Sequence, residues 1–175
     1  QRLKGPTVSL VPSSPRHITG RYIGWHNDPE VTRFSELRHR RHTAQSCRGY
    51  LKSMRDGGHC FWAIVASGPP ARHVGNIAAY IDRANQLAEI SILIGERTAW
   101  GRGLGSTAWS LVVDWLLGAG GKRKGVAGTM TANKAMLRVM ERSGMLVEAR
   151  QSRHFLVDGE EMDVVSAARF RKEGG

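Results

Sequence analysis

Hydrophobic positions with a period of two dominate the middle of the chain. Residues 60–66, 73–81 and 87–94 are apolar segments separated by Gly68-Pro69-Pro70 and by the polar residues 82–85. In the third segment the residues of one face are Ala88, Ile90, Ile92 and Ile94, and those of the other are Leu87, Glu89, Ser91 and Leu93. We predict three antiparallel strands, the last with one apolar and one mixed face.

Helical periodicity appears before and after these strands. Thr43 opens a segment to residue 54 in which Cys47, Tyr50 and Met54 share one face. A second helix is predicted after Gly103, and its apolar face carries Leu104, Ala108, Leu111, Val112, Trp115 and Leu116. A third is predicted over residues 134–143, between the N-cap Asn133 and Gly144.

The remaining segments complete an α/β pattern. Residues 8–11 form a short strand, and Asp28-Pro29 opens a short helix. Residues 124–131 follow the central helix as a strand, so a right-handed crossover to a parallel neighbour is expected. Two closing strands are expected near residues 146–157 and 161–169. We predict one domain, residues 1–175, with a mixed, mostly antiparallel sheet and flanking helices.

Charge and cysteine usage narrow the classes of partner. The net charge of +11 is concentrated in residues 33–55 and 122–142, which suits a polyphosphate ligand or an acidic partner. Nucleic acid is not favoured, because basic and aromatic residues do not interleave. No metal-ligand spacing occurs, so no metal is expected. Two unpaired cysteines, no signal-peptide segment and no membrane-spanning run favour a cytoplasmic protein without a membrane partner.

Glycines cluster in residues 100–106, Trp-Gly-Arg-Gly-Leu-Gly-Ser, between a predicted strand and a predicted helix. Glycine allows close approach to the backbone, and the first helical N–H groups are unpaired, so this turn predicts a phosphate site. A dinucleotide fold is disfavoured because no acidic residue occurs in residues 115–140. A P-loop is disfavoured because Gly121-Lys122 is followed by Arg123.

The same turn resembles the acyl-CoA-binding motif of the GNAT superfamily of N-acetyltransferases, Gln/Arg-x-x-Gly-x-Gly/Ala. Here it is Trp100-x-x-Gly103-x-Gly105, with Trp in the first position as in the branch of the RimJ and RimL ribosomal-protein acetyltransferases. Residues 25–31, 87–90 and 133–145 resemble further motifs of the family, in the same order. The resemblance covers most of residues 8–170 and implies the GNAT fold, with one splayed pair of parallel strands.

The resemblance implies acetyl-CoA as the acyl donor, bound between the two parallel strands. Its pantetheine arm would pair with the backbone of Ile92, Leu93 and Ile94. Its pyrophosphate would accept hydrogen bonds from the turn formed by Arg102, Gly103, Leu104, Gly105 and Ser106. Charge would come from Arg97, Arg102 and Lys134. Asn133 is a helix cap by its position and a pantetheine contact by the resemblance.

An amine must lose a proton before it attacks a thioester, so a general base is required. Glu89 is the candidate, since histone acetyltransferases of this superfamily use a glutamate in a similar Ala-Glu-Ile context; a salt-bridged strand carboxylate is the alternative. The usual tyrosine acid, seven positions after Asn133, is replaced by Met140. Tyr80 and Ser91 are the remaining candidates to protonate the thiolate, although a thiol of pKa about 8.5 does not strictly require an acid.

The acceptor side is predicted in the N-terminal region, with Trp25, Asn27, Glu36 and His42 as candidates that also have structural interpretations. Residues 34–43 resemble GNAT enzymes that acetylate amino-sugar nucleotides, in which the first basic segment would meet the pyrophosphate. We therefore predict acetyl transfer to a primary amine of a small molecule. An acetyltransferase of protein N-termini, a non-catalytic CoA-binding module and a homodimer remain open alternatives.

Overall fold

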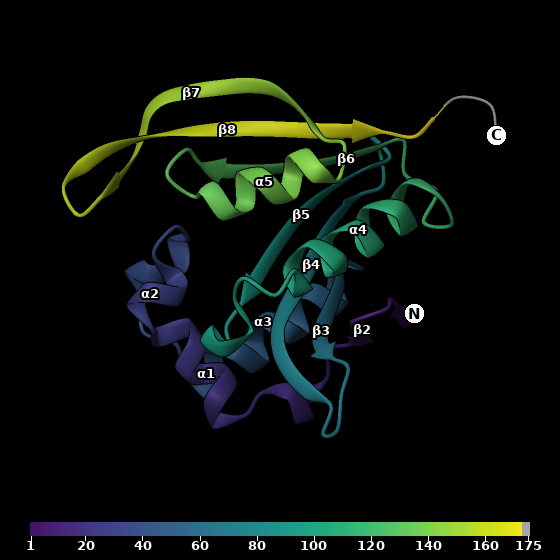
Figure 1. The fold of residues 1–175 in the computed structure, drawn as a ribbon, viewed down its shortest axis with the longest axis vertical. Coiled ribbons are helices and arrows are strands. Elements are labelled where there is room, and N and C mark those ends of the chain that lie inside the picture. Colours follow the sequence, from purple (N-terminus) through teal and green to yellow (C-terminus); the bar gives the residue numbers. More distant parts are fainter. Residues whose placement is uncertain (173–175) are drawn as a thin grey trace.

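The strands of this computed structural model, which describes residues 1–172, form one sheet in the order β1-β2-β3-β4-β5-β6-β8-β7 (Figure 1). The strands are β1 (Leu3–Lys4), β2 (Val8–Pro12), β3 (Cys60–Ala66), β4 (Arg72–Asp82), β5 (Leu87–Ile94), β6 (Lys124–Met130), β7 (Leu146–Val157) and β8 (Glu160–Phe170). The α-helices are α1 (Gly20–Asn27), α2 (Pro29–Thr32), α3 (Ala44–Asp56), α4 (Leu104–Leu117) and α5 (Lys134–Arg142). Short 3-10 turns are η1 (Pro15–His17), η2 (Glu36–His39) and η3 (Arg97–Ala99).

The two parallel strands, β5 and β6, separate soon after they meet. They are paired only where Leu87, Ala88 and Glu89 face residues 124–126. Beyond this point β5 continues along β4 to Ile94, while β6 continues along β8 to Met130. The edge of β5 after Glu89 therefore has no strand beside it, and the predicted mixed sheet with a splayed parallel pair is confirmed.

The two faces of the sheet have different coverings. In Figure 1, α4 and α5 lie in front of the sheet and α3 lies behind it. Ala88 and Ile90 of β5 belong to the main core together with Trp109, Val112 and Leu116 of α4. The burial of these large apolar side chains between α4 and the sheet removes their surface from water and holds the splayed strands in place. The alternation predicted for residues 87–94 is thus confirmed.

Most predicted elements are present, with small shifts at their ends, but α1 and β1 were not predicted. The α1 helix contains Gly20 and Gly24, which weaken intrinsic helix propensity. Its stability comes instead from the buried side chains Tyr22 and Trp25, which pack with Cys47 of α3. Among residues 1–172, no helix combines the length and the apolar character that a membrane crossing needs.

Candidate active site

A cleft of about 930 Å³ opens on the sheet face opposite α4. Side chains from four adjacent strands line its floor, and α1, α3, residues 34–42 and the β7–β8 hairpin contribute its walls. The floor residues include Phe61 (β3), Ala78 and Tyr80 (β4), Glu89, Ser91 and Leu93 (β5) and Val126 (β6). Because the cleft lies where β5 and β6 diverge, it is open to a ligand that enters between the two strands.

Glu89 occupies the last paired position of the parallel strands. It faces Tyr80 across the β4–β5 ladder and Val126 across the β5–β6 ladder. Its side chain is exposed, and it makes no ion pair or hydrogen bond with any residue that the structure describes. The salt-bridged alternative is therefore not observed in this structure, and the carboxylate is available to a ligand in the cleft.

Tyr80 is hydrogen-bonded to a second tyrosine from α3. The hydroxyl oxygens of Tyr50 and Tyr80 are 2.6 Å apart. Burial is the main cause that raises the pKa of Tyr50, and its hydrogen bond to Tyr80 raises it further. Tyr50 also packs edge-on against Phe61. The two hydroxyls therefore form a hydrogen-bonded pair at the wall of the cleft, and Tyr80 belongs to the same row of the sheet as Glu89.

The glycine turn before α4 presents a row of unused donors. Gly101 and Gly103 have φ angles of 73° and 75°, in the left-handed region that favours glycine. The first helical hydrogen bond of α4 runs from the Thr107 N–H to the Gly103 carbonyl. Within residues 1–172, the N–H groups of residues 102–106 donate no hydrogen bond. This arrangement fits a pyrophosphate, because orphan N–H groups and the positive end of a helix face the same space.

Gly105 brings the start of α4 against the open end of β5. A Cβ added at Gly105 would lie 3.3 Å from the Ile94 Cγ1 atom, so a larger residue would push helix and strand apart. Trp100 binds the turn to the same strand, since its indole Nε1 donates to the Ile94 carbonyl at 2.8 Å. The tryptophan in the first motif position therefore fixes the glycine turn relative to the unpaired edge of β5.

The three predicted cations differ in their environments. Arg97 lies over the Trp100 ring, 5.7 Å from its centroid, and 4.0 Å from the carboxylate of Asp28. Arg102 and Lys134 are exposed and make no ion pair among the described residues. Arg102 in the glycine turn and Lys134 at the start of α5 thus keep uncompensated charge, whereas the charge of Arg97 is shared with Asp28.

The α5 helix explains two of the sequence observations. Asn133 is its N-cap, and the Asn133 Oδ1 atom accepts a hydrogen bond from the Met136 N–H at 3.2 Å. Met140, at the position of the usual family acid, is 2% exposed and lies in the main core. The α5 position therefore cannot deliver a proton to the cleft, and a donor must come from another element.

Two of the four predicted acceptor residues line the cleft and two do not. Glu36 and His42 are part of its lining, whereas Trp25 and Asn27 are outside it. The Trp25 ring covers Gly95, where an added Cβ would collide with it. Asn27 holds the chain before α3, donating to the His42 carbonyl at 2.9 Å and accepting from the His42 N–H at 2.8 Å. The structure thus gives Trp25 and Asn27 supporting contacts.

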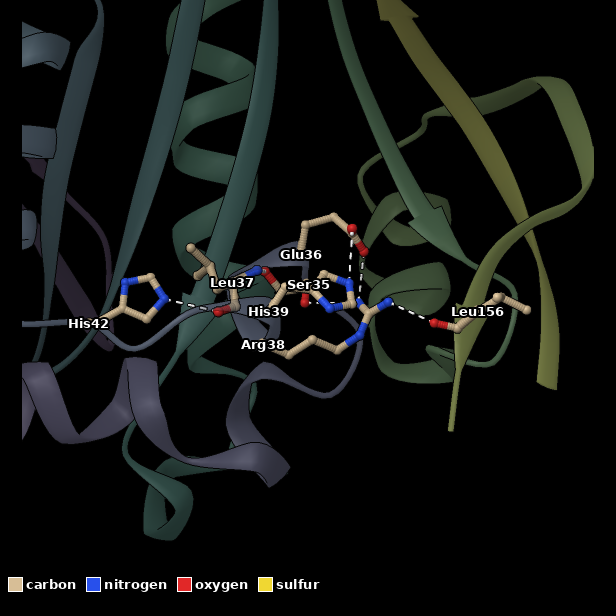
Figure 2. Close-up of polar contacts among 7 residues, drawn as sticks. All are labelled: Ser35, Glu36, Leu37, Arg38, His39, His42 and Leu156. Carbon is tan, nitrogen blue, oxygen red and sulfur yellow. Dashed lines mark hydrogen bonds and ion pairs between the residues drawn. The ribbon is translucent and has the colours of Figure 1, made fainter. Parts of the chain in front are cut away.

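Residues 35–42 connect the N-terminal helices to the β7–β8 hairpin, as Figure 2 shows. The Arg38 guanidinium donates to the Glu36 carboxylate at 2.8 Å and to the Leu156 carbonyl of β7 at 3.0 Å. The His42 Nε2 atom lies 2.9 Å from the Leu37 carbonyl. These contacts hold Glu36 on one wall of the cleft, while Arg38 ties that wall to the opposite hairpin.

A cluster of half-buried and buried imidazoles supports the same wall. The ring centroids of His26 and His42 are 5.4 Å apart, and those of Trp25 and His73 are 5.0 Å apart. Burial is the main cause that lowers the pKa of His26, of His73 and of His17. The neutral imidazoles are therefore favoured in the folded protein, which makes the integrity of this wall sensitive to acid.

Comparison with known proteins assigns this arrangement to a family. A family model described as the acetyltransferase (GNAT) domain matches residues 8–146. The chain belongs to the GNAT acetyltransferase family. The predicted resemblance is thereby confirmed, and the general activity of the family is acetyl-CoA-dependent N-acetyl transfer. No curated protein sequence matches the chain.

Solved GNAT structures share this fold over nearly the whole chain. The RimL acetyltransferase of ribosomal protein L7/L12, solved with coenzyme A, has a TM-score of 0.84 and 16% identity, covering 97% of this chain and 98% of its own. The ribosomal-protein-S5-alanine acetyltransferase from Vibrio fischeri has a TM-score of 0.83 and 11% identity, covering 99% and 98%. A chimera of the Vibrio cholerae spermidine N-acetyltransferase SpeG has a TM-score of 0.81 and 14% identity. This match covers 95% of this chain and 96% of the chimera. At these identities the likeness establishes the fold.

The GNAT cleft also contains residues that sequence reasoning missed. Tyr50 is predicted only as one position on the face of a helix, and His26 is not among the predicted site residues, yet both line the cleft. Phe155 and His154 reach the cleft from β7. A tyrosine on the apolar face of a helix is one signal that was present, because its hydroxyl needs a polar partner when it is buried. The partners of the other residues depend on how distant segments pack.

Proposed function

We propose that this GNAT protein transfers the acetyl group of acetyl-CoA to a primary amine of a small molecule by direct attack in a ternary complex. The observation that carries the proposal is the position of Glu89, an unpaired carboxylate at the point where β5 and β6 diverge. It lies on the cleft face of β5, and the unused N–H groups of the glycine turn follow the far end of the same strand. The proposed general base, Glu89, thus lies near the start of β5, and the proposed diphosphate site, the glycine turn, follows the end of the same strand.

The donor would follow the unpaired edge of β5. The N–H groups of Arg102, Gly103, Leu104, Gly105 and Ser106 would hold its pyrophosphate, with charge from the Arg102 and Lys134 side chains. The backbone of Ile92, Leu93 and Ile94 would pair with its pantetheine arm, as a missing strand would. A β5 N–H near Leu93 or Ile94 would polarise the thioester carbonyl.

Glu89 would act on the acceptor. An ammonium group is not a nucleophile, so the Glu89 carboxylate takes one of its protons, directly or through water, before the amine attacks. Because Glu89 has no partner among the described residues, no existing interaction must be broken for this step. The rest of the acceptor would occupy the cleft between β4 and residues 34–42.

A second cavity, of about 700 Å³, adjoins the cleft and shares His26 and Arg40 with its lining. Arg33 and Arg40 of this cavity make no ion pair among the described residues, although Glu30 and Asp158 also line it. Such a place suits a phosphate group of the acceptor. An amino-sugar nucleotide, with its amine at Glu89 and its diphosphate near Arg33 and Arg40, is therefore the first acceptor to test.

The test compares acceptors that differ only in the anionic part. Purified protein is incubated with acetyl-CoA and either a 4-amino sugar nucleotide or the same amino sugar without the nucleotide, and the acetylated product is measured by mass spectrometry. The proposal expects product with the nucleotide, and a higher KM for it in an Arg40→Ala variant. Equal rates with both compounds would show that the nucleotide is not recognised. Acetylation of peptides alone would indicate an acetyltransferase of protein N-termini.

A further inference from the structure

The Tyr50–Tyr80 pair has no part in the function proposed so far, and the position of the family acid is filled by the buried Met140. We propose that Tyr80 is the group that protonates the departing CoA thiolate, and that Tyr50 is a positioning residue that orients the Tyr80 hydroxyl. The inference rests on the proposed function, because it assigns two further residues to the same reaction. It names a source for the proton that α5 cannot supply.

The sheet register places Tyr80 beside the reacting groups. Tyr80 and Glu89 are directly opposite on antiparallel strands, so their side chains leave the same face of the sheet, with Cβ atoms about 5 Å apart. Val126, the third member of this row, belongs to the strand from which β5 then separates. For a thioester that lies along β5 beyond Glu89, the Glu89 carboxylate and the Tyr80 phenol would thus both be on the same side of the thioester.

Tyr50 fixes the direction of the hydrogen bond. With the two oxygens 2.6 Å apart, only one of the two protons can lie between them. Burial and the hydrogen bond to Tyr80 raise the pKa of Tyr50, so the phenolate of Tyr50 is disfavoured. Tyr50 therefore keeps its proton and donates it to the Tyr80 oxygen. The proton of Tyr80 is then free to point into the cleft.

The step balances without a further reactant. The nitrogen–carbon bond forms as the carbon–sulfur bond breaks, and the electron pair of that bond leaves on sulfur. The thiolate takes the Tyr80 proton to give free CoA thiol, and the Tyr80 phenolate accepts the hydrogen bond of Tyr50 until it regains a proton from water. Glu89 takes the first proton of the ammonium group before attack, and the second nitrogen proton passes to water as the amide forms. One proton is released overall, as acylation of an ammonium by a thioester requires.

Other ionisable groups face Tyr80 from each neighbouring element. Glu89 lies opposite on β5, Tyr50 is on α3, and Tyr22 of α1 is close enough to influence ionisation. The His59 ring is 5.6 Å from the Tyr80 ring, and the His59 Nδ1 atom accepts a hydrogen bond from the Ile81 N–H. The assignment of an alkaline decline in rate to the tyrosines therefore rests on comparing the wild type with tyrosine-to-phenylalanine variants, which change neither Glu89 nor His59.

The experiment measures kcat and KM against pH with acetyl-CoA and an accepted amine. The wild type should show a decline of kcat at alkaline pH, because the acid must be protonated. Tyr80→Phe should lower kcat by about 10²-fold and abolish the decline, while KM for acetyl-CoA stays unchanged. Tyr50→Phe should lower kcat by about 10-fold and move the decline to higher pH, because the phenolate loses its donor.

Tyr22→Phe is the matched control, since the Tyr22 hydroxyl makes no hydrogen bond among the described residues. It should keep an alkaline decline, changed at most in its midpoint because Tyr22 influences the ionisation of its neighbours, and a thermal shift with acetyl-CoA verifies that each variant is folded. An unmoved decline in Tyr80→Phe and Tyr50→Phe, with normal turnover by the wild type, overturns this inference alone. A wild type that releases no thiol with any amine overturns the proposed function and this inference with it.

Discussion

Tyr80 of β4 and Glu89 of β5 are paired residues in the last row of the sheet before β5 and β6 separate. Both side chains line the cleft. The Tyr80 hydroxyl is hydrogen-bonded to Tyr50, whereas the Glu89 carboxylate makes no hydrogen bond or ion pair with any residue that the structure describes. This row places a proton donor and a proton acceptor beside the opening between the strands.

Glu89→Gln should lower turnover at neutral pH by about 10²-fold, because the amide cannot accept the proton of the ammonium group. Raising the pH should partly restore the rate, since a larger fraction of the amine is then already neutral. A pH–rate profile of variant and wild type with the same amine measures this. If the two profiles have the same shape and height, Glu89 is not the base.

Gly103→Asp should abolish the rise in melting temperature that acetyl-CoA causes. Its carboxylate would repel the pyrophosphate and would occupy the space in front of the α4 N–H groups. Gly159→Asp is the matched control, because Gly159 also has a positive φ and open space around it, in the β7–β8 turn. The control should keep the full thermal shift. A retained shift in Gly103→Asp would show that the donor binds elsewhere.

Asn27→Ala should destabilise the protein by about 1–2 kcal/mol, because the backbone N–H and carbonyl of His42 lose their partner. Urea unfolding measures the free energy of unfolding. Asn85→Ala, in an exposed turn, serves as the comparison and should cost less than about 0.5 kcal/mol. An unchanged stability together with a raised KM for the acceptor would instead make Asn27 a substrate contact.

Acid should weaken the wall formed by α1 and the buried histidines. Burial lowers the pKa values of His26 and His73 in the folded protein, so the unfolded chain binds more protons between those lowered values and about 6.5. Stability from this source is complete above about pH 6.5 and is lost as the pH falls below it. Melting temperatures at a series of pH values should decline less steeply for a His26→Gln, His73→Gln double variant.

His154→Gln is the control for that series, because His154 is exposed on β7. It should reproduce the wild-type dependence of melting temperature on pH. A double variant with the same dependence as the wild type would show that these imidazoles do not control the acid response.

Local patterns account for the parts of the fold that were predictable. One face of α4 and one face of β5 are buried in the same core. Burial of one face produces a regular period of apolar residues within each segment, so each element could be predicted from its own segment. The glycine turn was predictable for the same reason, since its φ angles and free N–H groups depend on neighbouring residues. By contrast, the N-cap Thr19 is a weak local signal beside the two glycines of α1, and Tyr22 and Trp25 hold the helix through tertiary packing with Cys47 of α3.

The contacts that shape the acceptor side depend on distant segments. Tyr50 and Tyr80 are 30 positions apart, and Asn27 and His42 are 15 positions apart. Neither pair follows from a periodicity within one segment. Tyr50 and Tyr80 meet because α3 packs on the sheet beside β4, and Asn27 and His42 meet because the chain before α3 returns to the end of α1. The glycine turn is therefore predictable from its own segment, whereas for the acceptor side the sequence indicates the region and not the contacts.

The most direct test of the account is the release of free thiol from acetyl-CoA in the presence of an amine panel. The panel contains 3-amino and 4-amino sugar nucleotides, the corresponding amino sugars, spermidine and peptides with free N-termini. The account predicts thiol release that depends on a small primary amine and is lost in Glu89→Gln. Tight binding of CoA with no thiol release above background for every amine would contradict it.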